Sequence, residues 1–204
     1  MDYKSKIILI AGPTASGKSK IAINLAKKLN GEIVNADSMQ VYKQLKILTA
    51  RPSEKDQKNI KHHLFGIIDV RKRFSTGQWL KRCIKIINLI RKKNKTPIIV
   101  GGTGLYFKAL VDGLVKIPKF KTSEKNKILR LHNKLGQNQF YKRLLKLDPI
   151  SKKFVNQSDV NRSIRAYEVK KLTKKSLYKW FKETKTFFDK NDFVMTYIDY
   201  PRDK

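Results

Sequence analysis

The chain has 204 residues, and its 47 Lys and Arg against 16 Asp and Glu give a formal net charge of +31 at pH 7. Hydrophobic residues make up 40% of the chain, which excludes wholesale disorder, and the length predicts one compact domain or one with a small second lobe. The single cysteine, Cys83, excludes an internal disulfide framework. No apolar run approaches the roughly 18 residues of a membrane span, and no signal peptide opens the chain. We therefore expect a cytoplasmic protein with no membrane partner.

The positive charge has two explanations at this point. Clustered Lys and Arg gain affinity for a polyanion by releasing counterions from its phosphates, which favours a nucleic-acid partner. However, 37 of the basic residues are Lys, and the chain also has 21 Ile and 12 Asn. An AT-rich genome produces the same bias without selection for binding. Composition alone leaves both explanations open.

The first half of the chain alternates short apolar runs with amphipathic segments. Runs with the composition of buried parallel strands lie at 6–11, 32–36, 64–69 and 97–102. Segments with apolar residues at helical spacing lie at 20–29, 76–93 and 105–114. This alternation predicts an α/β core over residues 1–115, with a parallel sheet and right-handed crossovers.

The pattern changes after residue 115. Residues 116–185 have 21 Lys and Arg against 5 Asp and Glu, few glycines, and several short stretches of helical periodicity. We interpret them as a small, basic, helical lobe inserted into the α/β core. Residues 192–200 return to strand character, so 186–204 are expected to rejoin the core as its final strand.

The segment after the first predicted strand carries a phosphate-binding motif. It matches G-x-x-x-x-G-K-[ST] with Gly12, Pro13, Thr14, Ala15, Ser16, Gly17, Lys18 and Ser19. The glycines let backbone N–H groups turn toward a phosphate, Lys18 supplies a cation, and the Ser19 hydroxyl is a ligand for Mg²⁺. The helix that follows points its N-terminus at the same anion. The motif therefore predicts a P-loop NTPase-like three-layer fold that holds a di- or triphosphate.

The phosphate loop leaves the reaction open. A nucleotide hydrolase also needs a strand that ends in an Mg²⁺-binding Asp, and Asp69 is the one plausible candidate. The predicted strand at 97–100 ends instead in Gly101-Gly102. The sequence thus does not require ATP as the substrate.

A second group of polar residues follows the second predicted strand. Asp37 lies there, at the carboxyl edge of a parallel sheet, where it would be close to the bound phosphates. It is either a partner of Mg²⁺ or a general base, and the alternative is a helix N-cap formed by Asp37 and Ser38. Thr103 follows Gly101-Gly102 after a third strand, where the alternative is a plain strand-to-helix turn.

Six segments together resemble the tRNA dimethylallyltransferases, also called tRNA isopentenyltransferases. They are, in chain order, Gly12–Ser19, Ala36–Lys43, Thr49–Pro52, His62–Leu64, Val100–Phe107 and Arg162–Val169. The resemblance covers the whole chain in order and spacing, and the combination is far more specific than the phosphate loop alone.

The resemblance implies a reaction in which a dimethylallyl group passes from dimethylallyl diphosphate to N6 of the adenosine just 3′ of the tRNA anticodon. It implies that the phosphate loop and Mg²⁺ neutralise the diphosphate, that Asp37 takes a proton from the amine, and that Thr103 lies beside the reacting centre. The residues implied to bind the anticodon stem-loop are Asp37, Ser38, Met39 and Gln40, together with Asn161, Arg162, Ser163, Ile164 and Arg165. We expect a monomer.

The sequence departs from the family pattern in three places, one of which is Thr173-Lys174, where the family usually has Thr-Gly after the Arg162–Val169 segment. Lys46-Ile-Leu-Thr-Ala50 stands where the family usually has Asp-Ile-Gly-Thr-Ala, and Phe65-Gly66 stands where Ile-Asp usually follows His-His-Leu. Family members also continue in further helices that complete the tRNA cleft and supply an arginine near the diphosphate. This chain ends at Lys204, so we expect it to lack those helices.

Two other functions remain as alternatives. The first is a small P-loop kinase that phosphorylates a nucleoside or metabolite with ATP. Such a kinase would show Arg residues in a lid, whereas residues 116–185 are rich in Lys. The second is a basic RNA-binding module without catalysis.

Overall fold

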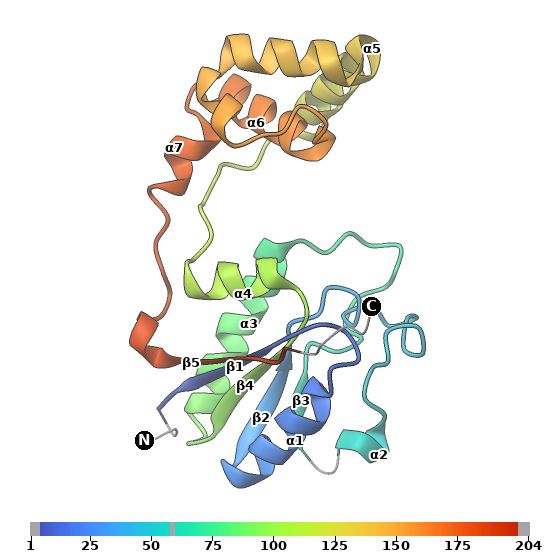
Figure 1. Ribbon diagram of the computed structural model, residues 1–204, viewed down its shortest axis with the longest axis vertical. Coiled ribbons are helices and arrows are strands. Elements are labelled where there is room, and N and C mark those ends of the chain that lie inside the picture. Colours follow the sequence, from blue (N-terminus) through green and yellow to red (C-terminus); the bar gives the residue numbers. More distant parts are fainter. Residues whose placement is uncertain (1–4, 58–59, 200–204) are drawn as a thin grey trace. The chain divides into compact units, whose positions relative to one another are not determined.

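The computed structural model describes residues 5–57 and 60–199 (Figure 1). The chain divides into two compact units, which are described separately below. The core unit is Met1–Gly113 with Thr186–Lys204, and the helical unit is Leu114–Lys185. The sequence-based boundaries were 1–115, 116–185 and 186–204, of which residues 200–204 lie outside the described part. The role of the helical unit in contacting tRNA stays a prediction.

The core unit contains a parallel sheet of five strands in the order β3-β2-β4-β1-β5. Their bounds are Ile7–Ala11 for β1, Gly31–Asn35 for β2, His62–His63 for β3, Thr96–Gly101 for β4 and Phe193–Tyr197 for β5. The central strands β1, β2 and β4 are buried almost throughout, as expected for strands covered on both faces. The predicted α/β fold with a parallel sheet is confirmed.

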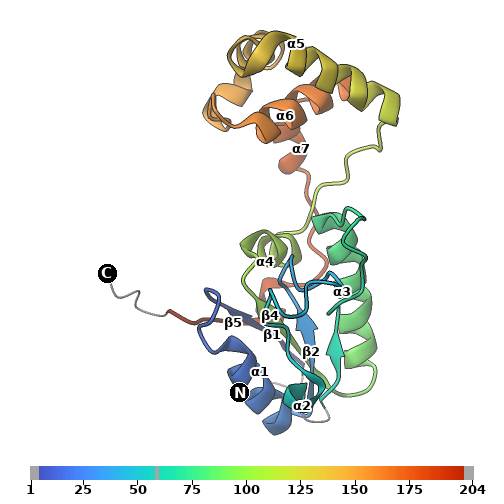
Figure 2. The ribbon, with the colours of Figure 1, turned by 90° about the vertical axis from the view of Figure 1, so that its right-hand side faces the viewer.

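Helices cover both faces of this sheet (Figure 2). Helix α1 (Lys18–Lys28) packs on one face, where Ala22, Ile23 and Ala26 meet isoleucines from β1, β2 and β4. Helix α3 (Thr76–Arg91) covers the opposite face, and α4 (Gly104–Val111) packs against α3. The short helix α2 (Glu54–Gln57) and the 3₁₀ turn η2 (Lys190–Asp192) complete the helical elements described in this unit. The result is the predicted three-layer arrangement.

The apolar run at 64–69 is not the strand that its composition predicts. Strand β3 lies just before it, at His62–His63, and the run itself is irregular apart from one parallel bridge between Tyr42 and Ile68. Leu64 has a φ of 63° and Gly66 a φ of 57°, which are left-handed conformations that break an extended strand. Local backbone conformation thus outweighs the apolar pattern at this edge of the sheet.

A buried charge cluster fastens the edge strand β3 to β2. Glu32 is 2% exposed, and its two carboxylate oxygens lie 2.7 Å from His63 Nε2 and 3.2 Å from Lys95 Nζ. Burial by itself raises the pKa of the Glu32 carboxyl, but the hydrogen bonds and charges of His63 and Lys95 outweigh it and hold that pKa below its usual value.

We expect Glu32→Gln to lower the free energy of unfolding by about 1–3 kcal/mol at neutral pH, because the replacement is a buried amide with poorer partners. Since the folded-state pKa of Glu32 is depressed, its contribution is present above the ordinary value of 4.5 and is lost as the pH falls through the lower folded-state value. The free energy of unfolding, measured with urea over that acid range, should therefore change less with pH in Glu32→Gln than in the wild type. Equal pH dependence in the two proteins would contradict this assignment.

The helical unit is built from three helices around one apolar core. Helix α5 (Thr122–Leu147) contains Gly136 at a φ of 69°, which interrupts it with a kink. A 3₁₀ turn, η1 (Pro149–Lys153), leads to α6 (Val160–Thr173) and then to the short α7 (Leu177–Phe181). The buried members of the core are Ile128, Phe140, Tyr141, Leu144, Val155, Ala166, Tyr167, Val169 and Leu177.

One buried carboxylate holds α7 in place. Asp148 is 2% exposed, and its Oδ2 accepts hydrogen bonds from Ser151 Oγ at 3.1 Å and from Ser176 Oγ at 2.8 Å. Ser176 is the N-cap of α7 and its hydroxyl accepts from the backbone N–H of Tyr178. The position of this five-residue helix therefore depends on the side chain of Asp148, which precedes the N-cap residue Ser176 by 28 residues.

Asp148→Ala is expected to destabilise the helical unit by about 1–3 kcal/mol, because it leaves two buried hydroxyl groups without their acceptor. Trp180 is the penultimate residue of α7, so its fluorescence reports the unfolding of this helix locally. Circular dichroism reports the loss of helical structure as a whole. Asp148→Asn keeps one acceptor oxygen and should cost clearly less than Asp148→Ala. Identical losses in the two variants would count against the hydrogen bonds as the cause.

Candidate functional site

The candidate site lies at the carboxyl end of three neighbouring strands. Strand β4 pairs with β1 on one side and β2 on the other, so the loops that follow these strands are adjacent. They surround a cavity of about 380 Å³. Its lining residues are Thr14, Ala15, Ser16, Gly17, Lys18, Ser19, Lys20, Asp37, Gln40, Thr49, Ala50, Phe65, Val100 and Gly101.

The phosphate loop forms one wall of this cavity. Ala15 has a φ of 64° and Gly17 a φ of 78°, and these left-handed conformations turn the chain before α1 begins at Lys18. Gly17 is the N-cap of α1 and makes no side-chain cap, so the first N–H groups of the helix are available to an anion. Among the predicted diphosphate-binding residues, Thr14 to Ser19 line the cavity, whereas Gly12 and Pro13 are not among its lining residues.

Lys18 supplies the positive charge of the loop. Its Nζ donates to the carbonyl oxygen of Pro13 and, at 3.3 Å, to Ser16 Oγ. Burial lowers the pKa of Lys18, and the charge of Asp37 opposes that shift. The ammonium therefore faces a carboxylate across the same cavity that would receive a phosphate.

The backbone around Asp37 is fixed by the side chain of Asn35, which is completely buried. Asn35 Oδ1 accepts from the N–H of Asp37 at 2.9 Å, and Nδ2 donates to the carbonyl oxygens of Asp37 and Leu64. The backbone carbonyl of Asn35 in turn accepts from Trp79 Nε1 at 2.8 Å. Trp79 is fully buried on α3 and stacks on Tyr106 of α4 at 4.3 Å between ring centroids.

The two carboxylate oxygens of Asp37 have different surroundings. Oδ1 accepts hydrogen bonds from the backbone N–H groups of Met39 at 2.8 Å and Gln40 at 3.3 Å. No hydrogen bond to Oδ2 is found within the described part of the chain. The carboxylate is thus oriented through one oxygen and has the other free to accept a proton or a ligand.

Thr103 connects two of the three loops. Its Oγ1 accepts from the N–H of Ser38 at 2.9 Å and donates to Ser38 Oγ at 3.3 Å, and its own N–H donates to Ala36 O at 3.1 Å. Thr103 is not among the residues that line the cavity. Its observed contacts therefore position the Asp37 loop.

The loops can approach so closely because residue 101 is glycine. A Cβ atom on Gly101 would lie 2.2 Å from the carbonyl carbon of Ala36 and 2.3 Å from its oxygen. Backbone atoms cannot yield to such a contact, so any side chain here would push the Asp37 loop away from the phosphate loop.

Six residues of the cavity wall were not among the predicted site residues: Lys20, Thr49, Ala50, Phe65, Val100 and Gly101. Thr49, Ala50 and Phe65 reach the cavity from two irregular loops, and Gln40 Nε2 secures the first loop by donating to Thr49 O at 2.8 Å. Thr49 and Ala50 belong to a segment that carries the family resemblance, which was a signal that their loop is near the site. Phe65 occurs where the sequence departs from the family pattern.

The predicted tRNA-binding residues fall in both units. Asp37, Ser38, Met39 and Gln40 follow β2 in the core unit, and the second group lies at the start of α6 in the helical unit. Within that second group Asn161, Arg162 and Arg165 are exposed, whereas Ile164 is half-buried against the core. Ser163 is completely buried, and its Oγ lies 3.1 Å from the Gln137 amide that donates to it. Its side chain therefore serves the packing of the helical unit.

The acidic residue that a nucleotide hydrolase would need does not reach the cavity. Asp69 pairs with Arg71, and hydrogen bonds from Arg71, including one from its backbone, lower the pKa of the Asp69 carboxyl to about 2. Asp69 is absent from the cavity lining. The described residues contain no cluster of three or more His, Cys, Asp or Glu that would hold a metal ion by themselves. Across the described ranges, no helix is long and apolar enough to cross a membrane.

The parallel sheet, the strand order and the phosphate loop between β1 and α1 define a protein of the P-loop NTPase-like fold class. Comparison with known proteins identifies its family. The model of the IPP transferase family matches residues 40–204, so the chain belongs to that family. This confirms the resemblance seen in the sequence.

Two curated relatives carry the same name. A tRNA dimethylallyltransferase from Pelagibacter ubique (strain HTCC1062) is 58% identical over 100% of this chain and 65% of its own length. One from Rickettsia bellii (strain OSU 85-389) is 44% identical over 86% of this chain and 56% of its own length. The chain therefore spans less than two thirds of the length of these curated relatives.

Solved structures share the fold. A crystal structure of a eukaryotic dimethylallyltransferase acting on tRNA has a TM-score of 0.82 at 31% identity, covering 95% of this chain and 48% of that one. The tRNA isopentenylpyrophosphate transferase from Staphylococcus epidermidis has a TM-score of 0.53 at 33% identity, covering 94% of this chain and 63% of that one.

Proposed function

We propose that this protein transfers a dimethylallyl group from dimethylallyl diphosphate to N6 of the adenosine next to the anticodon, on its 3′ side, in tRNA. The observation that carries the proposal is the shared cavity of the phosphate loop and Asp37. One wall suits a diphosphate, and the opposite wall offers a carboxylate oxygen without a hydrogen bond from the described residues. The names of the similar proteins support this reaction over a kinase.

The phosphate loop would receive the diphosphate of the donor. The backbone N–H groups between Ala15 and Ser19 and the ammonium of Lys18 stabilise the negative charge that grows on the diphosphate as its C–O bond breaks. The Ser19 hydroxyl lines the same cavity, and an oxygen donor of this kind fits Mg²⁺, which commonly binds through one or two protein groups and substrate phosphates. When bound there, Mg²⁺ would further neutralise the diphosphate.

Asp37 would act on the other side of the reacting carbon. The amine nitrogen of adenosine forms the new N–C bond while the C–O bond to diphosphate breaks, and the nitrogen then loses one proton. Asp37 Oδ2 accepts that proton, because Oδ1 is held by the N–H groups of Met39 and Gln40. An adenine inside a stacked loop cannot reach this cavity, so the base must leave its stack.

The tRNA would be held by both groups of predicted residues. Asp37 to Gln40 would surround the flipped adenosine, and Asn161, Arg162 and Arg165 would contact the anticodon stem-loop through their exposed side chains. The 21 Lys and Arg at 116–185 favour such a partner electrostatically. We also propose that the protein acts as a monomer.

The direct experiment incubates the chain with Mg²⁺, tRNA that lacks the modification, and labelled dimethylallyl diphosphate. Label should appear in the tRNA and, after digestion, in N6-dimethylallyladenosine. A parallel reaction with ATP and nucleosides tests the kinase alternative. A folded chain that turns over ATP and leaves tRNA unlabelled would refute the proposed transfer.

Thr103→Val is expected to lower the transfer rate about tenfold, because valine keeps the shape of threonine but leaves the N–H of Ser38 without its acceptor and so loosens the Asp37 loop. Thr103→Ser retains the hydroxyl and should restore most of the rate. Single-turnover label transfer at saturating substrates checks both variants. Failure of serine to restore the rate would contradict the hydrogen bond as the cause.

A further inference from the structure

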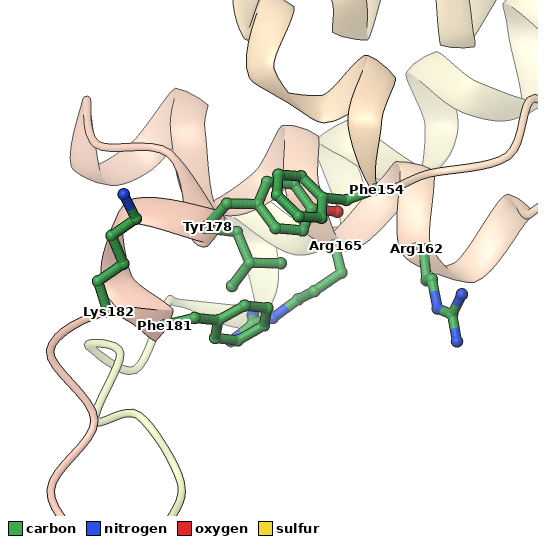
Figure 3. A pocket seen from close by; sticks show the side chains of 7 residues that line it. Phe154, Arg162, Arg165, Tyr178, Phe181 and Lys182 are labelled. Atoms are coloured by element: carbon green, nitrogen blue, oxygen red, sulfur yellow. The ribbon is translucent and has the colours of Figure 1, made fainter.

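The helical unit contains a cavity whose lining includes Arg162 and Arg165 of the predicted tRNA-binding group and five residues outside that group. It measures about 630 Å³, which is within the range of small-ligand pockets. Helix α7 and its neighbours supply the lining, which consists of Phe154, Arg162, Arg165, Leu177, Tyr178, Phe181 and Lys182. Every lining residue belongs to the helical unit. Three aromatic rings and three cations thus meet around one hollow (Figure 3).

The aromatic rings offer open faces. Tyr178 stacks on Phe154 at 4.2 Å between centroids and an angle of 15°, and it meets Phe181 edge to face at 5.8 Å. Phe154 remains 52% exposed and Phe181 49% exposed. Figure 3 shows the Phe154–Tyr178 stack on one side of the pocket and the Phe181 ring on the other. These half-exposed rings present apolar faces on which a flat ligand could stack.

The cations differ in how much of their charge is already paired. Arg165 lies 2.5 Å from Glu168 and is therefore largely neutralised. The side chain of Arg162 pairs with Asp159 through Nε at 3.4 Å, in addition to the hydrogen bond from the Arg162 backbone N–H, and this side chain is 71% exposed. Lys182 has no ion pair within the described part of the chain. Arg162 and Lys182 are thus available to an anion at the rim.

The pocket is held in shape by the packing beneath it. Asp148 and Ser176 fix the start of α7, and Leu177 on the pocket floor belongs to the apolar core. Burial, with the nearby Asp148 carboxylate, raises the pKa of the Tyr178 hydroxyl, which therefore stays a neutral hydrogen-bond donor at neutral pH. The rings need no rearrangement to receive a ligand, so little ordering entropy would oppose binding.

We propose that this pocket binds one unpaired nucleotide of single-stranded RNA, with its base against the exposed rings of Phe154 and Phe181 and its phosphates against Arg162 and Lys182. Aromatic rings that alternate with cations are the composition of single-strand binding sites, where each stacked base contributes about 1–3 kcal/mol. A duplex does not fit, because its bases already stack on one another. The excess of Lys and Arg over Asp and Glu in this unit favours a polyanion over a protein partner.

The inference rests on the proposed function for the source of the RNA, a tRNA loop, and it adds a base contact in the helical unit to the one proposed at the cavity of the core unit. A measurement of RNA binding tests this inference separately from the proposed transfer reaction. The probe is an RNA hairpin in which 2-aminopurine replaces one loop nucleotide at a time. Its fluorescence should fall several-fold at one loop position when the full chain binds, because stacking on an aromatic ring quenches this base.

The variants test the rings and the cations separately. Phe154→Leu and Phe181→Leu keep apolar volume but remove stacking, and each should abolish the quenching at that position and weaken hairpin binding about tenfold. Phe181→Tyr should retain both. Arg162→Gln and Lys182→Gln should each reduce the slope of log affinity against log salt by about 0.7. Unfolding midpoints of all variants establish that the helical unit is folded.

Matched controls lie outside the pocket. Phe187 is 46% exposed and belongs to the core unit, so Phe187→Leu should change neither quenching nor affinity. Lys171 lines a different cavity of the helical unit, so Lys171→Gln should leave the quenching intact.

Each outcome is decisive. Position-specific quenching that requires Phe154 and Phe181 supports the pocket even if no dimethylallyl transfer occurs, in which case only the proposed function fails. Normal transfer with quenching that is absent, or unchanged in folded Phe154→Leu and Phe181→Leu, overturns the pocket alone. Displacement of the hairpin by duplex RNA with equal affinity, or by free adenosine monophosphate at a lower concentration than the hairpin, would also overturn it.

Discussion

Asp37→Asn is expected to reduce dimethylallyl transfer about 10²–10⁴-fold, the range that loss of a general base produces. Asparagine has nearly the same shape as aspartate, and its side-chain oxygen can still accept from the N–H groups of Met39 and Gln40. What it lacks is an anionic oxygen to take the proton from the adenosine amine. The loss should therefore appear in the single-turnover rate at saturating substrates.

The affinity of Asp37→Asn for tRNA distinguishes a base from a structural residue. Filter binding of unmodified tRNA should remain close to wild type, because the loop keeps its hydrogen bonds. Asp69→Asn is a suitable control, since Asp69 is paired with Arg71 and does not line the cavity. Full transfer activity in Asp37→Asn would remove the general-base role, and an equal loss in Asp69→Asn would show that the effect is not specific to the cavity.

Lys18→Ala should lower transfer about 10²–10³-fold, as expected when one preorganised group that stabilises the developing charge is removed. The deletion also weakens binding of the diphosphate donor, so the loss should appear at both low and saturating donor. Since burial lowers the pKa of Lys18, the ammonium loses its proton at a lower pH than an exposed lysine, and donor affinity should decline earlier on the alkaline side.

The control for Lys18→Ala is Lys28→Ala, at the opposite end of the same helix. Lys28 is exposed in the last turn of α1. Its substitution by alanine removes the same charge as Lys18→Ala but leaves the phosphate loop unchanged. Donor affinity measured by isothermal titration should be unchanged in Lys28→Ala. If both lysines had equal effects, net charge rather than the loop would explain the loss.

The sequence predicted the parts of the fold that follow local rules. Alternating apolar runs and amphipathic segments gave the parallel sheet and its helices, and the phosphate loop was evident because a short motif encodes its backbone. The edge strand was mislocated, because left-handed residues at Leu64 and Gly66 end it after two residues. The spacing of apolar residues gives no indication of a left-handed conformation at a residue other than glycine, such as Leu64.

Residues of the cavity were predictable where a short motif or the end of a strand specifies their position. Asp37 could be anticipated because β2 ends just before it. Thr49 and Phe65 come from irregular loops whose paths depend on tertiary contacts, such as the hydrogen bond from Gln40 to the carbonyl of Thr49. Ser163 shows the opposite difficulty. The family resemblance implied a contact with tRNA, whereas its side chain packs inside the helical unit.

The buried Asn35 has a consequence for how this protein tolerates change. Its backbone accepts from Trp79 deep in the core, while its side chain holds the chain at Asp37. Asn35 thus connects the packing of Trp79 on α3 directly to the position of the Asp37 carboxylate. A core substitution that shifts Trp79 would therefore also shift the carboxylate of Asp37. We expect such substitutions to affect both the stability of the core and the proposed transfer.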